Sequence, residues 1–293
     1  MSVWAMVAHF GDAAVTRRAV TALLSGDAKP DRVLVVDNGG DLPPLEMDGV
    51  ETIDPGHNVG FAGACRLGAQ RAVAGGARWV WLFNNDAVPD AGCLAALLAA
   101  GEAAPRVALL SPVIALRDAP ALWYAGGEVE PRSLSVTHFR RPRLDTAHDT
   151  GFVTGCAWLA STDFVRACGP PDASLFLYFE DVDWSLRAQA AGWRTLVVPD
   201  ARVLHDVEFA GARRVFSPLA TYYMTRNRLL LARRWGSPPF ALGAALWWGA
   251  RQLLKCRSAS SVIAFKIAVG MGLWHGLAGR RGAAPERLVR RLR

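Results

Sequence analysis

The chain has 293 residues, of which 52% are apolar and 20% are charged, a composition that excludes a disordered chain and is typical of a globular protein. The formal net charge is +7, but it is distributed unevenly. From Arg233 onward, twelve Lys and Arg residues accompany the single acid Glu286, so this end carries +11 and residues 1–232 carry −4. A basic end on a mildly acidic body predicts a polyanion near the C-terminus.

The cysteines and the N-terminus bear on the cellular compartment. Five cysteines are scattered without a C-x-x-C pair, which favours a reducing compartment over a disulfide framework or a zinc site. The first ten residues lack a basic stretch followed by an apolar one, so we expect no signal peptide and a cytoplasmic protein. The cysteines are Cys65, Cys93, Cys156, Cys168 and Cys256.

Apolar runs alternate with helical patterns over residues 1–117. This alternation is typical of an α/β protein with a parallel sheet and crossover helices. We expect strands at Val3–His9, Arg32–Val36, Thr52–Ile53, Trp79–Phe83 and Val107–Ile114, and helices at Asp12–Leu24 (capped by Asp12), Gly60–Ala74 and Asp90–Ala100.

The pattern weakens over Arg117–Ala147, where exposed loops or an edge hairpin are expected, and then becomes regular again. We expect strands at Gly151–Ala160 and Thr195–Val198, the latter leading to His205, and helices at Thr162–Ala167 and Glu180–Ala191.

Two apolar runs, Phe240–Ala250 and Val262–Gly279, dominate the C-terminal region. Neither reaches the roughly 20 uncharged residues that span a bilayer. Their tryptophans lie beside Arg and Lys, including Arg257, a mixture typical of helices in a membrane interface. The alternative is two core helices with a solvated basic end. Small residues recur every fourth position at Ala264, Ala268, Gly272 and Gly276, which would allow a second helix to approach closely.

Two of the expected strands end in aspartates, and ligands bind at the carboxyl ends of parallel strands. Asp37 follows an apolar strand and would accept hydrogen bonds from a base N–H or a ribose hydroxyl. Asp86 follows Trp81–Asn85 and would hold a divalent cation on a diphosphate. The alternative is that both aspartates only cap loops.

A glycine-containing turn, Asn58–Gly63, precedes the helix that is expected to begin at Gly60. Glycines permit close approach of the backbone to a ligand, and a helix start offers free N–H groups to negative charge. The turn by itself is a weak signal of an anion site.

Three acids, Glu180, Asp181 and Asp183, crowd the start of another expected helix. The helix dipole stabilises acids there, which is a sufficient structural explanation. The functional alternative is that one of them acts as a general base. Arg187 lies four residues after Asp183 and can hold it by an ion pair, which leaves Glu180 or Asp181 for chemistry. His205, at the end of the last expected strand, is either structural or a metal ligand.

Taken together, these segments resemble the family-2 inverting glycosyltransferases, within them the bacterial rhamnosyltransferase and galactofuranosyltransferase-like members. The matching segments run in family order over about residues 1–230. They are VVDN (Val35–Asn38), NVGFAG (Asn58–Gly63), WLFNND (Trp81–Asp86), TGCAWLAS (Thr154–Ser161), LYFEDVDWSLR (Leu177–Arg187), His205 and YYMTRNR (Tyr222–Arg228).

The resemblance implies an A-type glycosyltransferase fold, a Rossmann-like, mostly parallel sheet flanked by helices, here with a C-terminal helical extension. It implies that Asp181 is the general base, with Glu180 beside it, and that Asp86 and His205 bind Mn²⁺ or Mg²⁺. Asp183 and Arg187 would support the site. The implied donor-binding residues are Asp37 (to the base), Asn38, Asn58, Gly60, Arg66, Asn84, Asn85 and Asp86.

Two departures from the family pattern concern the donor. Asn84 is neutral at the first position of the D-x-D motif, so metal binding would depend on Asp86, His205 and the diphosphate. Arg66 stands in Cys65–Gly68, where relatives often have Asn-Asn-x-Gly, and would reach the diphosphate or the sugar.

The resulting hypothesis is an inverting transfer of a rhamnosyl- or galactofuranosyl-like sugar from a dTDP or UDP donor to a glycan or polyprenyl-linked acceptor. We expect a donor-binding half at 1–117, an acceptor-binding and catalytic half at 118–217, and a basic helical segment at 218–293. The protein would be peripheral on the inner face of the cell membrane, and the sequence does not predict its oligomeric state.

Three rival functions fit less well. A sugar-nucleotide pyrophosphorylase would carry a glycine-rich loop with Arg or Lys after its first strand, whereas AHFGDAAVTRR has one glycine. A non-catalytic nucleotide-sugar-binding protein would have little use for the acids at Glu180–Asp183. A nucleic-acid binder is disfavoured because the basic residues lie among Trp and Leu, without a recognisable module.

Overall fold

The computed structural model describes residues 2–117, 122–139, 143–206, 216–255 and 258–292, so Cys256 and Arg257 lie outside the described residues. The chain folds into two units. The first unit comprises Met1–Glu128, His138–Ala173 and Asp181–Val207, and the second comprises Val129–Thr137, Ser174–Glu180 and Glu208–Arg293.

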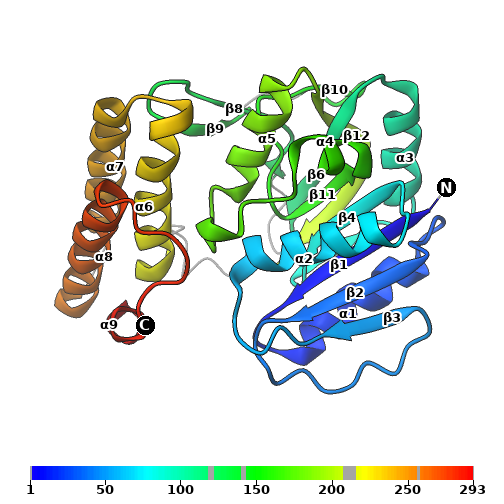
Figure 1. The fold of residues 1–293 in the computed structure, drawn as a ribbon, viewed down its shortest axis with the longest axis horizontal. Helices are drawn as coiled ribbons and strands as arrows, with labels where there is room; N and C mark the ends of the chain where they lie inside the picture. Colours follow the sequence, from blue (N-terminus) through cyan, green and yellow to red (C-terminus); the bar gives the residue numbers. More distant parts are fainter. Residues whose placement is uncertain (1, 118–121, 140–142, 207–215, 256–257, 293) are drawn as a thin grey trace. The chain divides into compact units, whose positions relative to one another are not determined.

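The helices and strands are those labelled in Figure 1. In chain order they are β1 (Val3–His9), α1 (Ala13–Ser25), β2 (Arg32–Asp37), β3 (Val50–Ile53), α2 (Gly60–Ala74), β4 (Trp79–Asn84), β5 (Ala87–Pro89), α3 (Cys93–Ala103), β6 (Val107–Leu116), β7 (Leu122–Tyr124), β8 (Gly127–Val129), β9 (Val136–His138), β10 (His148–Asp149), β11 (Ala157–Ser161), α4 (Thr162–Cys168), a 3₁₀ turn (Ala173–Leu175), α5 (Glu180–Ala190), β12 (Arg194–His205), α6 (Pro218–Trp235), α7 (Pro238–Leu253), α8 (Ala259–Leu277) and α9 (Glu286–Leu292).

One sheet forms the centre of the first unit. Its strands follow the order β10-β12-β6-β11-β4-β1-β2-β3, with β5 beside β12 and β7 beside β6. β1 pairs in parallel with β2 and β4, and β6 pairs in parallel with β12. β11 runs antiparallel between β4 and β6. The expected α/β class is confirmed, as a mostly parallel sheet with an antiparallel insertion.

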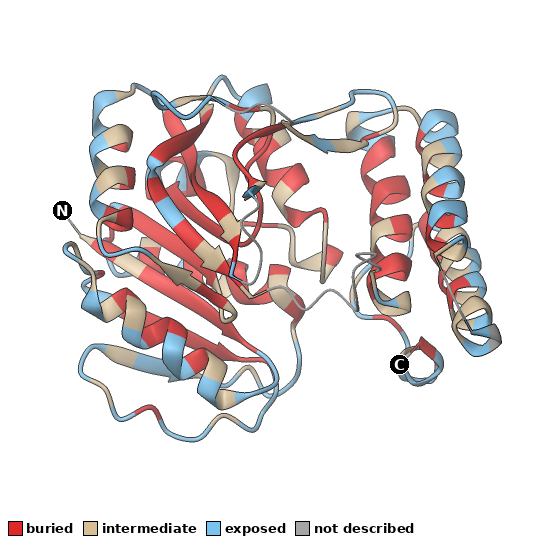
Figure 2. Ribbon diagram, turned by 180° about the vertical axis from the view of Figure 1, so that it is seen from behind, coloured by how far each residue is buried: buried red, intermediate tan, exposed pale blue. Residues whose placement is uncertain are grey.

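Helices cover both faces of this sheet (Figure 1). Successive strand side chains point to opposite faces. Met6 and Leu82 accordingly belong to the same core cluster as Ala69 of α2, Phe164 of α4 and Trp184 of α5. The strands β1, β2, β4, β6, β11 and β12 are buried along most of their length, as Figure 2 shows in red.

The opposite face is covered by α1 and α3, which contact β1 and β6 respectively. Gly101 of α3 lies so close to the Trp79 ring that an added Cβ would approach it to 2.8 Å. This large aromatic ring therefore fills the space between helix and strand. The side chain of Asp12 accepts a hydrogen bond from the Ala14 N–H at the start of α1, which confirms the expected cap.

The strand expected at Gly151–Ala160 was too long. β11 begins only at Ala157. The preceding N–H groups bond to side chains of α5 instead of a strand: Val153 N–H donates to Ser185 Oγ at 3.1 Å, and Gly155 N–H donates to Asp181 Oδ2 at 3.1 Å. A run of apolar residues in the sequence does not reveal that the backbone N–H groups donate to side chains instead of to a neighbouring strand.

The second unit contains α6, α7, α8 and α9, with α6 and α8 in close contact. The small residues of α8 make this contact. An added Cβ on Gly272 would lie 2.9 Å from Tyr222 O, and one on Gly276 would lie 2.9 Å from Arg226 O. The expected close approach of a second helix is confirmed. Its partner, α6, and the short helix α9 both lie in the segment 218–293 that was expected to be helical, although the sequence predicted the bounds of neither.

One described helical stretch, Ser260–Leu277, is long and apolar enough to cross a membrane by length and composition. The stretch has 18 residues, as many as the expected apolar run Val262–Gly279, and it contains Lys266, so it too falls short of roughly 20 uncharged residues. Core helices of soluble proteins pass the same test, although only 28% of this stretch is buried. Ile263, Trp274 and Leu277 of α8 are exposed.

Candidate active site

Polar side chains end three neighbouring strands of the first unit. In the parallel register, His9 at the end of β1 pairs with Asp37 at the end of β2. On the other side of β1, Ala8 pairs with Asn84 at the end of β4. These side chains therefore lie at one edge of the sheet, where ligands of open α/β sheets bind.

Asp37 holds the loop that follows β2. Its Oδ1 accepts hydrogen bonds from Gly39 N–H at 3.0 Å and Gly40 N–H at 2.8 Å, and its Oδ2 accepts one from Leu42 N–H at 3.0 Å. Burial raises the pKa of Asp37, but the hydrogen bonds from these three N–H groups together lower it by more. The pKa of Asp37 is therefore below its ordinary value. The carboxylate is a fixed anion with part of its acceptor capacity already used.

The loop after β2 is joined to the start of α2. Asn38 accepts a hydrogen bond from Val59 N–H at 3.1 Å, and its amide donates to Gly60 O at 3.3 Å. Asn58 Oδ1 accepts from Gly60 N–H at 2.8 Å. Gly60 has φ +73°, a conformation that glycine adopts without steric cost. Three predicted donor-binding residues are thus brought together. Arg66, nearly two turns further along α2, is exposed.

Asn85 has a structural contact of its own. Its amide donates to Phe10 O at 3.1 Å and to Thr16 Oγ1 at 3.0 Å, which ties the end of β4 to the loop and helix that follow β1. A donor contact for this residue remains a prediction.

Asp86 and His205 meet although 119 residues separate them in the chain. His205 Nε2 lies 3.0 Å from Asp86 Oδ1 and 3.5 Å from the Asn84 amide nitrogen. The contact arises because β12, which His205 ends, pairs antiparallel with β5 immediately after Asp86. Burial lowers the pKa of His205, but the interactions with Cys156 and Asp86 outweigh it and raise the pKa to about 10. Without a cation, the two side chains form an ion pair.

A second group of possible ligands was missed in the sequence. His9, Asp37 and Asp41 have ligand atoms that all lie within 4.8 Å of one another. His9 Nε2 is 3.6 Å from Asp41 Oδ1, and its Nδ1 is 2.6 Å from Thr16 Oγ1. The only available signal was a histidine at the end of the first strand. Asp41 is exposed and stands in no motif.

Asp181 does not point freely into solvent. Its carboxylate accepts hydrogen bonds from Gly155 N–H at 3.1 Å and Val182 N–H at 2.8 Å. Burial raises its pKa above the ordinary value, although these two N–H groups act in the opposite direction. Cys156 is the residue after Gly155. Its backbone carbonyl accepts a hydrogen bond from Asn84 N–H at 2.9 Å, and its side chain interacts with His205. Adjacent residues thus contact Asp181 and the Asp86–His205 pair.

The other two acids at the start of α5, Asp183 and Glu180, lie in different surroundings. Arg187 Nε donates to Asp183 Oδ2 at 2.9 Å, the ion pair that the spacing predicts, and its Nη1 and Nη2 donate to Cys168 O and Pro170 O. Glu180, the first residue of α5, is 4% exposed.

In the second unit, Arg226 and Asn227 of α6 form a clamp that holds the segment before α5 through its carbonyl oxygens. No role was expected for these two residues from the sequence. Phe176, Tyr178 and Phe179 all have φ between +65° and +71°, which is strained for side chains of this size. Asn227 of α6 donates to the carbonyl oxygens of Leu175, Leu177 and Tyr178 at 3.0, 2.9 and 2.7 Å. Its neighbour Arg226 donates to Leu175 O as well, at 2.8 Å. The only signal for this clamp was the YYMTRNR segment.

Sequence comparisons place the chain among characterised enzymes. Residues 2–228 match the family described as "Glycosyltransferase like family 2". The chain is 29% identical over 261 residues to the N-acetylglucosaminyl-diphospho-decaprenol L-rhamnosyltransferase of Mycobacterium tuberculosis, covering 80% of this chain and 82% of the relative. It is 31% identical over 215 residues to the galactofuranosyltransferase GlfT1 of the same species, covering 70% of each chain.

Solved structures share the fold at low sequence identity. GalNAc-T7 with UDP, GalNAc and Mn²⁺ superposes with a TM-score of 0.64 at 13% identity, covering 92% of this chain and 55% of that one, so the chain spans about half its length. TarS of S. aureus gives 0.55 at 13% identity, covering 96% and 88%. The mannosyltransferase PcManGT of Pyrobaculum calidifontis, in complex with GDP-Man and Mn²⁺, gives 0.53 at 16%, covering 98% and 77%.

Proposed function

The chain belongs to glycosyltransferase family 2, and from this membership we propose that it transfers a rhamnosyl- or galactofuranosyl-type sugar, with inversion, from a nucleoside-diphosphate donor to a lipid-linked acceptor. The relatives support this choice, since one is named for rhamnosyl transfer to a diphospho-decaprenol acceptor and another for galactofuranosyl transfer. The observation that carries the proposal is the Asp86–His205 pair, linked through Gly155 and Cys156 to Asp181.

The donor would lie along the sheet edge formed by β1, β2 and β4. Asp37 and Asn38 at the end of β2 would contact the base and ribose. Asn58 and Gly60 lead directly into α2, whose N-terminal end favours the negative charge of a diphosphate. Arg66 is exposed and would reach the diphosphate or the sugar. No acid of α2 lies in its first turn to oppose this charge.

The residues present fit a divalent cation. Asp86 offers a carboxylate oxygen and His205 an imidazole nitrogen, 3.0 Å apart, and the side-chain amide of Asn84 lies beside them, with its nitrogen 3.5 Å from His205 Nε2. These are ligand types that Mn²⁺ accepts. When bound, the cation would supply Lewis-acid stabilisation of negative charge on the departing diphosphate. A bound cation requires neutral His205, so the proton that His205 carries in the ion pair must leave first.

Asp181 would take the proton from the acceptor hydroxyl. A carboxylate whose pKa is raised by burial is a stronger base than an exposed one. The hydrogen bond from Gly155 N–H fixes its Oδ2, so the carboxylate is oriented before the acceptor arrives. Arg187 holds Asp183 two residues further on, which keeps this turn of α5 in place.

Donor binding tests the proposal at its first step. Thermal unfolding would be measured with dTDP and UDP sugars, each with and without Mn²⁺, because a ligand that binds only the folded state raises the unfolding temperature by mass action. We expect one donor to stabilise the protein in the presence of Mn²⁺, and Asp86→Ala to abolish the Mn²⁺-dependent part.

Asp163→Ala is the matched control, since Asp163 is an exposed aspartate on α4. It should leave the shift unchanged. Stabilisation of Asp86→Ala by donor and Mn²⁺ to the wild-type extent would refute the proposed cation site. If no nucleotide sugar stabilises the wild type, the donor proposal itself fails.

A further inference from the structure

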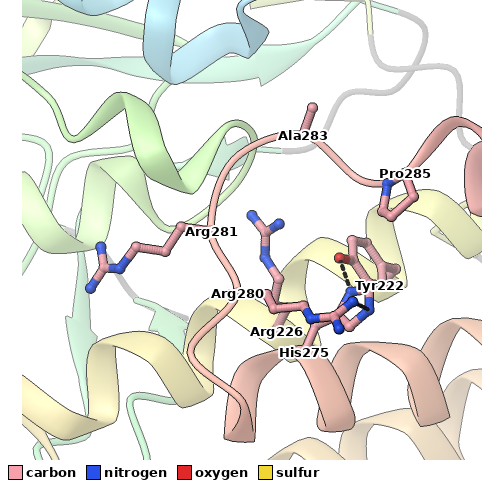
Figure 3. A pocket seen from close by; sticks show the side chains of 7 residues that line it. All are labelled: Tyr222, Arg226, His275, Arg280, Arg281, Ala283 and Pro285. Carbon is pink, nitrogen blue, oxygen red and sulfur yellow. Dashed lines mark hydrogen bonds between the residues drawn. The ribbon is translucent and has the colours of Figure 1, made fainter.

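The second unit contains a pocket of about 240 Å³ that the proposed active site does not use. Tyr222 and Arg226 reach it from α6, His275 from the last turn of α8, and Arg280 from the loop after α8 (Figure 3). None of the lining residues, all of which belong to the described part of the chain, carries a carboxylate. The pocket is large enough to hold several waters.

The protonation of His275 follows from its partners. Burial lowers its pKa, and the charges of Arg280 and Arg226 lower it further, so the imidazole is neutral. Arg280 Nη1 lies 3.3 Å from His275 Nε2, and a guanidinium can only donate. Nε2 is therefore the acceptor and Nδ1 carries the hydrogen, which it donates to the Tyr222 oxygen at 2.7 Å. The Tyr222 O–H is then directed to another acceptor.

The positive charge of Arg226 is not offset by the partners the structure shows. Its three nitrogens donate to neutral oxygens, namely Asn227 Oδ1, Gly282 O and Leu175 O. Its guanidinium also lies 4.8 Å from the Tyr223 ring centre. The side chain is 1% exposed, so its charge acts in surroundings that screen it weakly.

Arg280 is the exposed cation of the pocket. Its guanidinium lies 4.7 Å from the Trp274 ring centre, beside neutral His275. Arg281 contributes differently, since its side chain points away from the other side chains in Figure 3 and donates to Ser174 Oγ. Two guanidinium groups and a hydroxyl donor thus converge on the pocket, a donor set that matches phosphate oxygens.

An exposed apolar stripe leads to this pocket. Ile263 and Trp274 are eleven residues apart on α8, which is about three turns, and Leu277 follows nearly one turn later. These residues therefore share one face, and they are 59%, 54% and 52% exposed. Arg280 follows the end of this stripe, and its guanidinium lies 4.7 Å from the ring centre of Trp274.

We propose that the pocket binds the diphosphate of a lipid-linked acceptor, with the lipid chain lying along the exposed stripe of α8. This inference rests on the proposed function and adds to it the place where the acceptor's carrier is held. The room for several water-sized groups and the two guanidinium groups favour a diphosphate over the single phosphodiester of a membrane phospholipid.

Binding of geranylgeranyl diphosphate to the full chain tests the proposal, measured calorimetrically in a chelator so that no cation or donor takes part. Arg280→Gln should weaken this binding at least about tenfold, the usual effect of losing one charged hydrogen-bond donor to phosphate. Arg287→Gln, an exposed arginine on α9 outside the pocket, should leave it unchanged. Equal binding by wild type and Arg280→Gln overturns the proposal.

Three further probes separate the sources of phosphate. Geranylgeraniol should bind far more weakly, because it lacks the diphosphate. Inorganic pyrophosphate should bind more weakly than the lipid diphosphate but with the same dependence on Arg280. Phosphatidylglycerol vesicles should lose no more affinity with Arg280→Gln than with Arg287→Gln, which removes the same charge outside the pocket. If instead only vesicle binding depends on Arg280, the pocket holds a phospholipid headgroup and the proposal is wrong.

The outcome is independent of the donor experiment. Arg280-dependent lipid diphosphate binding without any donor stabilisation would support the pocket and count against glycosyl transfer. The converse result is that the donor stabilises the wild type but not Asp86→Ala, while lipid diphosphate binds wild type and Arg280→Gln equally. This result would refute the proposed role of the pocket and leave the proposed reaction unaffected.

Discussion

Two aspartates of the proposed active site have opposite electrostatic surroundings. Three loop N–H groups lower the pKa of Asp37, whereas burial raises the pKa of Asp181. A carboxylate that is strongly held as an anion suits recognition of a donor group, and one whose protonated form is favoured suits proton abstraction. The difference arises from the deeper burial of Asp181 and from the additional backbone N–H donors around Asp37, because both residues are aspartates.

Replacing Asp181 by Asn should lower the turnover number by about 10² to 10⁴, the usual contribution of a general base. The amide keeps the shape of the side chain and an oxygen that can accept from Gly155 N–H, so the fold should be retained. Turnover would be measured as nucleoside diphosphate released with a lipid-linked acceptor present, beside donor binding by thermal shift.

Glu180→Gln is the control for this assignment, since Glu180 precedes Asp181 in the same helix turn. It should reduce turnover much less. Near-normal turnover of Asp181→Asn together with loss of turnover in Glu180→Gln would transfer the role of base to Glu180.

Cation binding should become tighter as the pH rises. His205 has a raised pKa and is protonated near neutrality, so Mn²⁺ must displace its proton. Below that pKa, the apparent affinity should rise by up to about tenfold per pH unit, and calorimetry in buffers of different ionisation enthalpy should show proton release. An affinity for Mn²⁺ that is independent of pH between about 6 and 8 would contradict this role of His205.

The same residue makes the cation-free protein less stable in alkali. Because the folded-state pKa of His205 lies above its unfolded value, the stabilising contribution is complete below the unfolded pKa of 6.5 and is lost as the pH rises toward about 10. His205→Gln should remove this part of the pH dependence of the free energy of unfolding.

Positions at strand ends made part of the site predictable. Asp37 and Asp86 end or follow strongly apolar strands, and the structure brings Asp86 to His205 at 3.0 Å. His9 was not found because a single histidine at a strand end has no distinguishing neighbours. The Asn227 clamp was not found because its partners are carbonyl oxygens, which every residue possesses.

At the level of elements, the packing of α6 on α8 depends on two glycines. Gly276→Ala would place a Cβ 2.8 Å from Leu229 Cβ and 2.9 Å from Arg226 O. Backbone cannot easily move aside, so we expect a loss of about 1–3 kcal/mol in the free energy of unfolding, as for other overpacked sites. Urea unfolding of the variant and the wild type measures this difference.

Gly270→Ala is the matched control on the same helix. Gly270 is exposed, and an added Cβ would meet no atom within 4 Å. Alanine should stabilise the helix there by roughly 0.5–1 kcal/mol, because glycine loses more conformational freedom on folding. Equal effects of the two substitutions would show that α6 and α8 do not pack at Gly276.

Two features of the fold could not be predicted from the periodicity of the sequence, namely the bounds of α6 and the pairing direction of β11. Most residues of α6 are buried, polar Thr221, Thr225 and Asn227 among them, so its sequence shows no single apolar stripe facing a polar side. β11 was expected as a strand, but its antiparallel place between β4 and β6 was not, because alternation of residue types does not encode the direction of pairing. The order of strands and helices in residues 1–117 was predictable since each is strongly apolar on the appropriate face.

For the whole molecule, the basic C-terminal end and the exposed apolar residues of α7 and α8 favour binding to anionic membranes. Trp247 is 64% exposed, with the Arg251 guanidinium 5.6 Å from its ring centre. Sedimentation with phosphatidylglycerol vesicles should retain the protein, less so at high salt. Trp247→Ser should weaken retention by roughly ten- to a hundredfold, because burial of a large apolar side chain contributes about 1.5–3 kcal/mol.

Leu144→Ser is the control, since Leu144 is also exposed but belongs to the first unit. It should leave retention unchanged. Retention on DNA but not on vesicles would instead favour a nucleic acid as the polyanionic partner.

The antiparallel strand in the middle of the sheet has a consequence for synthesis of the chain. β4 and β6 are made before β11, yet they contact each other only through it. A nascent chain that has not yet reached Ala157 therefore exposes two unpaired apolar strand edges, which are templates for aggregation. A ribosome that stalls within this interval, or a fragment that ends there, would leave a product that needs a chaperone. Once Ala157–Ser161 has been made, β11 can pair with both of these edges, and the other edge of β6 is covered when β12 follows.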